Sequence, residues 1–169
     1  AGQPDDITLL TLVRPAGAVA AAPSSAEHPE ETIHLTLPAR TTVLAKVAEM
    51  TARVARDVGF PEAEIQRIVL AVDEVVTNVI AYSYGPGTTE TLELDLIPRA
   101  DGLAVTVTDY GQPFDFEAKS RNYDGHATED MPEGGIGLFL VRQYMDEARY
   151  EPETYAGNVV TMVKHLPKG

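Results

Sequence analysis

The sequence has 169 residues, which suits one domain of ordinary size with a tail, and 44% of them are hydrophobic, enough to form a core. A formal net charge of −13 and the lack of a basic run make the chain a poor candidate for binding nucleic acid or anionic membranes. It has no cysteine, which excludes disulfides and thiolate metal sites.

The N-terminal region divides into two parts. Residues 7–13 are rich in β-forming residues and predict a short strand. Residues 15–30 combine small residues with prolines and predict a linker, because they cannot bury enough apolar surface to become ordered. The chain contains no run of the roughly 18–20 apolar residues that span a membrane, and its start lacks the basic and then apolar pattern of a signal peptide. We therefore expect a cytoplasmic location.

The main domain is expected to begin at residue 31 with a strand and two helices. Alternating apolar residues predict a strand over 32–37, and apolar residues at helical spacing predict an amphipathic helix over about 40–58. A second helix follows Pro61, which suits a first helical turn, and is closed by residues 85–87. Its wide apolar stripe predicts burial on more than one side.

The rest of the chain predicts two strand pairs on either side of a third helix. The expected elements are strands over 92–96 and 103–107, a helix over 134–146, and strands over 148–152 and 158–166. This order predicts an α+β sandwich with a mixed or antiparallel sheet rather than a doubly wound parallel sheet.

A carboxylate and a carboxamide share one face of the second helix. Glu74 and Asn78 are four residues apart in an otherwise apolar stretch. The carboxamide oxygen can bind Mg²⁺, a hard cation often shared with nucleotide phosphates. The carboxylate can orient or deprotonate a hydroxyl nucleophile. The alternative interpretation is a pair of solvated positions on a surface helix.

A second motif, Asp109-Tyr110-Gly111, stands at the end of a predicted strand. An Asp in this place can accept a hydrogen bond from an exocyclic amine such as that of adenine. Gly111 would let a flat ring approach the backbone closely. The alternative is an ordinary turn that ends a strand.

A third motif, Gly134-Gly135-Ile136-Gly137, stands at the mouth of the third helix. Free N–H groups and the helix dipole make such a mouth an anion site, and the glycines let the backbone wrap a phosphate. The motif is not a Walker A loop, because no Gly-Lys-Ser/Thr follows, and no predicted strand precedes it as in a Rossmann fingerprint.

In this order and spacing the three motifs resemble those of the GHKL (Bergerat) ATPases, and within them the anti-sigma-factor serine/threonine kinases of bacterial partner switching. The resemblance covers about residues 31–166. It implies the histidine-kinase-like ATPase fold, an α+β two-layer sandwich with a mixed or antiparallel sheet covered by helices on one face. One departure is Tyr82, which stands where the family commonly has His.

The resemblance also implies a role for each site residue. Glu74 would be the general base or a positioning group, and Asn78 would hold Mg²⁺. Asp109 would bind the adenine amine beside Gly111, and Thr161 would support Asp109 or a bridging water. Gly135 and Gly137 would bind phosphate. Residues 116–133 would form the ATP lid, in which Lys119, Arg121 and His126 are candidates to contact the γ-phosphate.

The implied function is an ATP- and Mg²⁺-dependent kinase that phosphorylates a STAS-type anti-anti-sigma protein and sequesters a sigma factor. A homodimer is compatible with the resemblance, whereas direct contact with nucleic acid or membrane is not expected. The alternative is a non-catalytic, nucleotide-gated binding module that regulates a fused phosphatase or a partner protein. A chaperone-like or topoisomerase-like ATPase would need further domains.

Residues 1–14 show a smaller resemblance, to the last strand of PPM-type (RsbU/SpoIIE-like) serine phosphatases. In that family an Asp at the position of Asp6 helps to hold the catalytic metals. The expected domains are therefore a phosphatase remnant over 1–14, a linker over 15–30 and the kinase-like domain over 31–169, in the C-terminal part of a longer protein. The alternative is a disordered leader.

Overall fold

The computed structural model describes residues 32–85, 87–115 and 135–167. The expectations for residues 1–14, for the linker and for the lid with Lys119, Arg121 and His126 lie outside these described residues. The described part contains the elements of one domain, and nearly all of the residues that carry the three motifs lie within it.

The order of the elements confirms the predicted one: a strand, two helices, two strands, a helix and two strands. The elements are β1 (Ile33–Pro38), the 3₁₀ turn η2 (Thr41–Val43), α1 (Leu44–Val58), α2 (Glu62–Asn78), the π-helical turn η3 (Val79–Tyr84), β2 (Thr91–Arg99), β3 (Gly102–Asp109), α4 (Gly135–Tyr144), β4 (Glu147–Thr154) and β5 (Gly157–His165).

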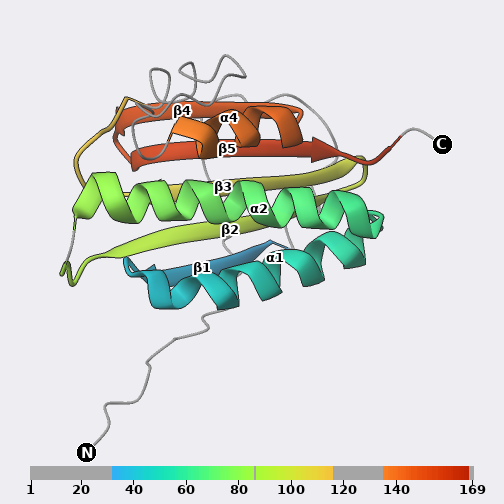
Figure 1. The fold of residues 1–169 in the computed structure, drawn as a ribbon, viewed down its shortest axis with the longest axis horizontal. Coiled ribbons are helices and arrows are strands. Elements are labelled where there is room, and N and C mark those ends of the chain that lie inside the picture. The colour runs from blue at the N-terminus through green and yellow to red at the C-terminus, as the bar shows by residue number, and fades with distance from the viewer. Residues whose placement is uncertain (1–31, 86, 116–134, 168–169) are drawn as a thin grey trace, which may run out of the picture.

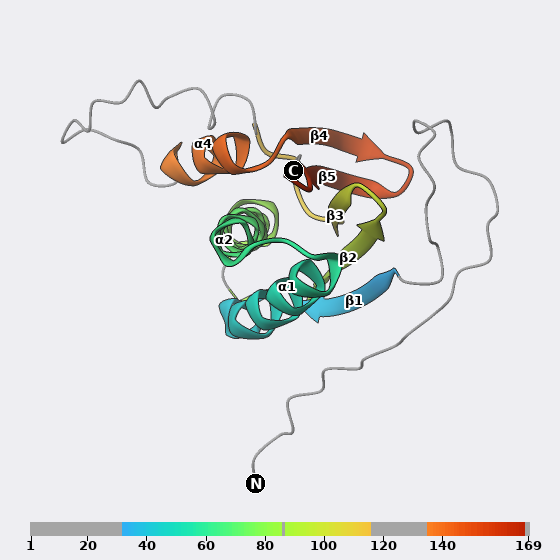
Figure 2. The same ribbon diagram turned by 90° about the vertical axis from the view of Figure 1, so that its right-hand side faces the viewer.

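The strands form one five-stranded sheet in the order β1-β2-β3-β5-β4, and every neighbouring pair is antiparallel. Figure 1 shows the helices in front of this sheet, and the turned view of Figure 2 shows that α1, α2 and α4 cover the same face. The two-layer prediction is therefore confirmed, with an antiparallel rather than a mixed sheet.

The core lies between the helices and the covered face of the sheet. Along β3 the side chains of Leu103, Val105 and Val107 are fully buried, as the alternation predicts. Figure 2 shows α2 between α1 and α4, and this position explains the wide apolar stripe of that helix. Its residues Ile68, Val72 and Val75 are all fully buried.

The second helix does not stop at Asn78. It widens into the π-helical turn η3, a rare geometry that occurs often at functional sites. The turn ends against the loop that follows β3, because the N–H of Gln112 donates to the carbonyl oxygen of Ser83 over 2.8 Å. The tail of α2 and the end of β3 are thereby joined.

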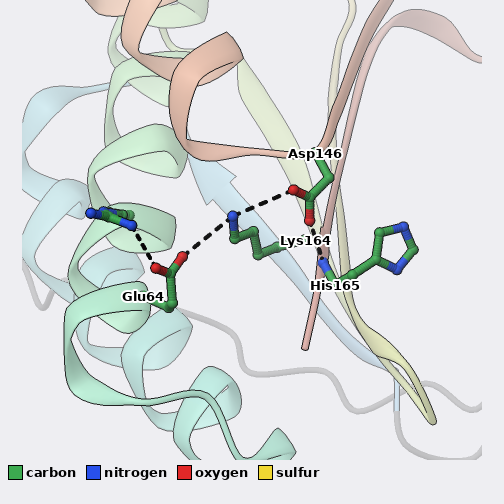
Figure 3. A network of polar contacts seen from close by, with 5 residues as sticks. Glu64, Asp146, Lys164 and His165 are labelled. Carbon is green, nitrogen blue, oxygen red and sulfur yellow. Dashed lines mark hydrogen bonds and ion pairs between the residues drawn. The ribbon is translucent and has the colours of Figure 1, made fainter. Parts of the chain in front are cut away.

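A group of charged residues fixes the opposite end of the molecule (Figure 3). Lys164 Nζ lies 3.3 Å from Glu64 Oε2 and 3.5 Å from Asp146 Oδ1, and both Lys164 and Glu64 are mostly buried. Asp146 Oδ2 accepts a hydrogen bond from the backbone N–H of His165 over 2.7 Å. These contacts join the start of α2 to the junction of α4 and β4, and so hold the two helices that meet at the candidate site.

Candidate functional site

The first and third motifs meet where α4 lies against α2. A Cβ atom built on Gly137 would overlap the carboxylate of Glu74, so with any other residue at this position that carboxylate would have to move aside. Gly135 is the first residue of α4. The carboxylate of Glu74 therefore lies beside the N-terminal turn of a helix, where free N–H groups attract anions.

The environment of Glu74 favours a proton-accepting role. The side chain is half-buried, and burial raises the pKa of its carboxyl, with a smaller contribution from the negative charge of Asp73. A carboxylate with a raised pKa binds a proton more readily than one on the surface, which suits a general base. The interpretation of Glu74 as a fully solvated surface residue does not fit this position.

Asn78 is almost completely buried, at 3% exposure. Its Nδ2 donates to the backbone oxygen of Glu74 over 2.6 Å, which leaves the amide oxygen to accept a ligand. Within the described ranges no three His, Asp or Glu side chains gather into a metal-binding group. Asn78 could hold a Mg²⁺ ion together with phosphate oxygens and water, an arrangement common for this ion.

The carboxylate of Asp109 is 1% exposed and only partly satisfied. Its Oδ1 accepts hydrogen bonds from the N–H of Gly111 over 3.0 Å and from Nδ2 of Asn158 over 2.9 Å. Its Oδ2 is buried and has no hydrogen-bond partner among the described residues. A buried acceptor without a donor is costly, so this oxygen fits a ligand that supplies an N–H group, such as the amine of adenine.

Gly111 lies where a side chain would not fit. A Cβ atom at this position would overlap the backbone carbonyl of Ser83 at the end of η3. The glycine thus allows the loop after β3 to pack on the π-helical turn, next to the carboxylate of Asp109. The second motif is in this way joined to the helix that bears the first.

The structure does not bring Thr161 to Asp109, and the expected support comes from Asn158 instead. In the register of β3 and β5, Asp109 is opposite Asn158 and Thr161 is opposite Thr106. Because successive residues of a strand face opposite sides of the sheet, a residue three positions beyond Asn158 faces away from the helices. Asn158 is 3% exposed, whereas Thr161 is half-buried on the other face.

Asn158 is the functional candidate that the sequence analysis missed. The antiparallel register was the only signal for it, since that register decides which residue of the last strand lies across from Asp109.

Tyr82, which stands where the family commonly has His, belongs to an aromatic cluster. The ring of Tyr82 lies 6.1 Å from that of Phe114, which in turn lies 5.0 Å from that of Tyr150. The hydroxyl of Tyr150 also accepts a hydrogen bond from the N–H of Phe114 over 3.1 Å. These rings fix the chain just before residue 116, where the expected lid begins.

Known proteins are similar to this chain over most of its length. Residues 37–164 match the family model of the histidine kinase-like ATPase domain. The serine-protein kinase RsbW of Halalkalibacterium halodurans is 34% identical over 145 residues, which cover 83% of this chain and 87% of that protein. The RsbW of Bacillus subtilis is 29% identical over 138 residues, or 79% of this chain and 85% of that protein.

A solved structure shares the fold. The crystal structure of the RsbU and RsbW domains of Rv1364c from Mycobacterium tuberculosis has a TM-score of 0.59 and 19% sequence identity. The match covers 82% of this chain and 33% of that one, so this chain spans about a third of its length. Among the residues that the structure describes, no helix is long and apolar enough to cross a membrane.

Proposed function

This chain belongs to the histidine kinase-like ATPase family, and on that premise we propose that it is an ATP-dependent protein serine kinase of bacterial partner switching. The observation that carries the proposal is the unsatisfied Oδ2 of Asp109, in a site that also holds Glu74 and Asn78 on the adjoining helix. The protein substrate would be a STAS-type anti-anti-sigma protein, and the sequestered partner a sigma factor. The RsbW relatives, which are named serine-protein kinases, support this assignment.

Each residue has a distinct task in this proposal. Asp109 accepts a hydrogen bond from the adenine amine beside Gly111, and the first turn of α4 binds phosphate through its N–H groups. Asn78 holds Mg²⁺, which neutralises phosphate charge when it is bound. Glu74 accepts the proton of the serine hydroxyl as that oxygen attacks the γ-phosphorus, and ADP leaves with the electron pair of the broken bond between the γ-phosphorus and the β,γ-bridging oxygen. Phosphoryl transfer depends mainly on such positioning and charge neutralisation.

The proposal extends to the regions beyond the described residues. The end of a phosphatase-like domain over residues 1–14 is supported by its motif, and by the occurrence of RsbU and RsbW domains in one solved chain. A cytoplasmic location and a homodimer belong to the same proposal. Sedimentation of the purified chain with and without ATP would test the homodimer.

Calorimetric titration with ATP, with and without Mg²⁺, tests the nucleotide site. We expect Mg²⁺ to strengthen ATP binding to the natural chain, and Asn78→Ala to lose most of this gain, about tenfold or more in affinity, because a direct ligand is removed. Binding without Mg²⁺ should change little in this variant. Thr77→Ala, one position earlier on the same helix, is the matched control and should keep the gain. An equal Mg²⁺ effect in all three proteins would contradict the role of Asn78.

The carboxyl of Asp109 predicts opposite effects of pH on affinity and on stability. Burial raises its pKa, against the hydrogen bonds from Asn158 and Gly111, which lower it. A protonated Asp109 accepts the amine of adenine less well, so the affinity for ATP should fall as the pH falls through this raised pKa.

The folded carboxyl keeps its proton to a higher pH than the unfolded one. Its contribution to the free energy of unfolding therefore falls as the pH rises from the ordinary Asp value through the raised one. ATP titration and urea denaturation over a pH series would measure both slopes, with Asp109→Asn as the reference. An affinity that does not change with pH in this range would rule out the ionised carboxylate as the acceptor.

A further inference from the structure

Two residues outside the three motifs face the carboxylate of Asp109. Asn158 on β5 is 3% exposed, and Ser83 on η3 is 4% exposed. They come from two different elements and are 75 positions apart in the sequence. Burial of polar groups costs free energy, so two buried polar side chains beside one carboxylate indicate a role at this site.

The orientation of the Asn158 amide follows from its partners. Its Oδ1 accepts a hydrogen bond from the backbone N–H of Glu153 over 3.0 Å. Because a backbone N–H can only donate, the oxygen must lie on that side and the NH₂ group on the other. The NH₂ group donates to Oδ1 of Asp109 over 2.9 Å and to the carbonyl oxygen of Gly111 over 3.0 Å.

The N–H of Glu153 is brought to Asn158 by an unusual backbone. Glu153 has a φ of +53°, the only positive φ of a non-glycine residue in the described part of the chain, and it lies in an irregular stretch of β4 between Glu151 and Thr154. Residues in such conformations persist where the surrounding structure requires them, often at functional sites. The irregularity of β4 therefore helps to hold Asn158 in one orientation.

These contacts give the two carboxylate oxygens of Asp109 different numbers of hydrogen bonds. Oδ1 accepts two N–H groups, from Gly111 and Asn158, so it is held as a hydrogen-bond acceptor. Oδ2 has no partner among the described residues. The carboxylate is thus fixed with one oxygen occupied and the other available.

Ser83 supplies a second unsatisfied group. Its Oγ is buried and, like Oδ2 of Asp109, has no hydrogen-bond partner of good geometry among the described residues. The residue packs against Gly111, two positions after Asp109, and its hydroxyl is one of the hydrogen-bonding groups that oppose the rise that burial causes in the pKa of Asp109. One acceptor and one hydroxyl donor therefore lie side by side, and neither makes a hydrogen bond of good geometry among the described residues.

We propose that Asn158 and Ser83 make this site selective for a 6-aminopurine, an inference that rests on the proposed ATP site. Asn158 is a positioning residue, because it holds Asp109 with Oδ2 as an acceptor for the 6-amino group. Ser83 determines specificity, because its hydroxyl donates to the neighbouring ring nitrogen, N1. A 6-oxopurine carries an oxygen at position 6 and an N–H at N1, so its oxygen would face the carboxylate.

ATP and ITP provide the test, since they differ only at this edge of the base. Dissociation constants of both nucleotides with Mg²⁺ would be measured for the natural chain, Asn158→Ala, Ser83→Ala and Thr161→Ala. The natural chain should prefer ATP. This preference should fall about tenfold in Asn158→Ala, the size of one hydrogen bond to a charged group, and about fivefold in Ser83→Ala, the size of one hydrogen bond between neutral groups. The affinity for ITP should change far less. Thr161→Ala, on the other face of the sheet, should keep the full preference.

The other outcomes separate two kinds of failure. If the natural chain binds neither nucleotide, the proposed ATP site fails together with this inference. If it prefers ATP and both variants keep that preference, or lose ATP and ITP affinity equally, only the roles of Asn158 and Ser83 are overturned. If Asn158→Ala does not fold, Ser83→Ala still tests the proposal. This variant should fold, because it removes a hydroxyl that makes no hydrogen bond of good geometry among the described residues.

Discussion

Glu74→Gln is expected to slow phosphoryl transfer by a factor of about 10² to 10⁴ and to leave ATP binding nearly unchanged. Glutamine has the size of glutamate, so it fits beside Gly137 as the natural side chain does. It cannot accept a proton, and the serine hydroxyl of the substrate would lose its base. Transfer of labelled phosphate from ATP to a STAS-type partner measures the rate, and calorimetry measures the affinity for ATP.

The neighbouring carboxylate supplies the matched control. Asp73→Asn removes a negative charge that contributes to the raised pKa of Glu74. The rate at neutral pH should then change by no more than a few fold, while the acidic limb of the pH profile should shift to lower pH. Transfer that survives in Glu74→Gln would exclude this residue as the base. Stable binding of the partner by the natural chain without transfer would favour the non-catalytic binding module.

Gly137→Ala is expected to lower the rate of transfer by about a hundredfold, with little change in the free energy of unfolding. The new methyl group would occupy the space of the Glu74 carboxylate and push it aside. Displacement of a catalytic group by about 1 Å can cost a factor of this size. The fold should tolerate the change, because the end of a flexible side chain can move and alanine gains up to about 1 kcal/mol over glycine within a helix.

A double substitution shows whether the effect acts through Glu74. In the Glu74→Gln background the catalytic carboxylate is already absent, so Gly137→Ala should cost little further activity. Full additivity of the two losses would mean that the methyl group acts elsewhere, for example on phosphate binding. Urea denaturation of all four proteins would show that the losses of activity do not come from unfolding.

The sequence predicted the fold class and the order of the elements because these depend on local patterns. The alternation of Leu103, Val105 and Val107 shows one buried face of a strand, and the stripe of α2 shows a helix covered on two sides. The spacing of Glu74 and Asn78 places them on one helical face whatever the rest of the chain does. The predicted limits of the elements differ from those observed by only a few residues in most cases, since Gly and Pro mark the ends.

The partners of each site residue were decided by the tertiary structure alone. Asn158, rather than Thr161, holds Asp109, because the register of β5 on β3 decides which side chains face the helices. A shift of one residue would have reversed the two faces. The closeness of Gly137 to Glu74 likewise depends on how α4 lies on α2, two elements far apart in the chain. Periodicity within a segment identifies its buried face, but it contains no information on which distant residue lies opposite, and the chemistry of this site depends on those pairs.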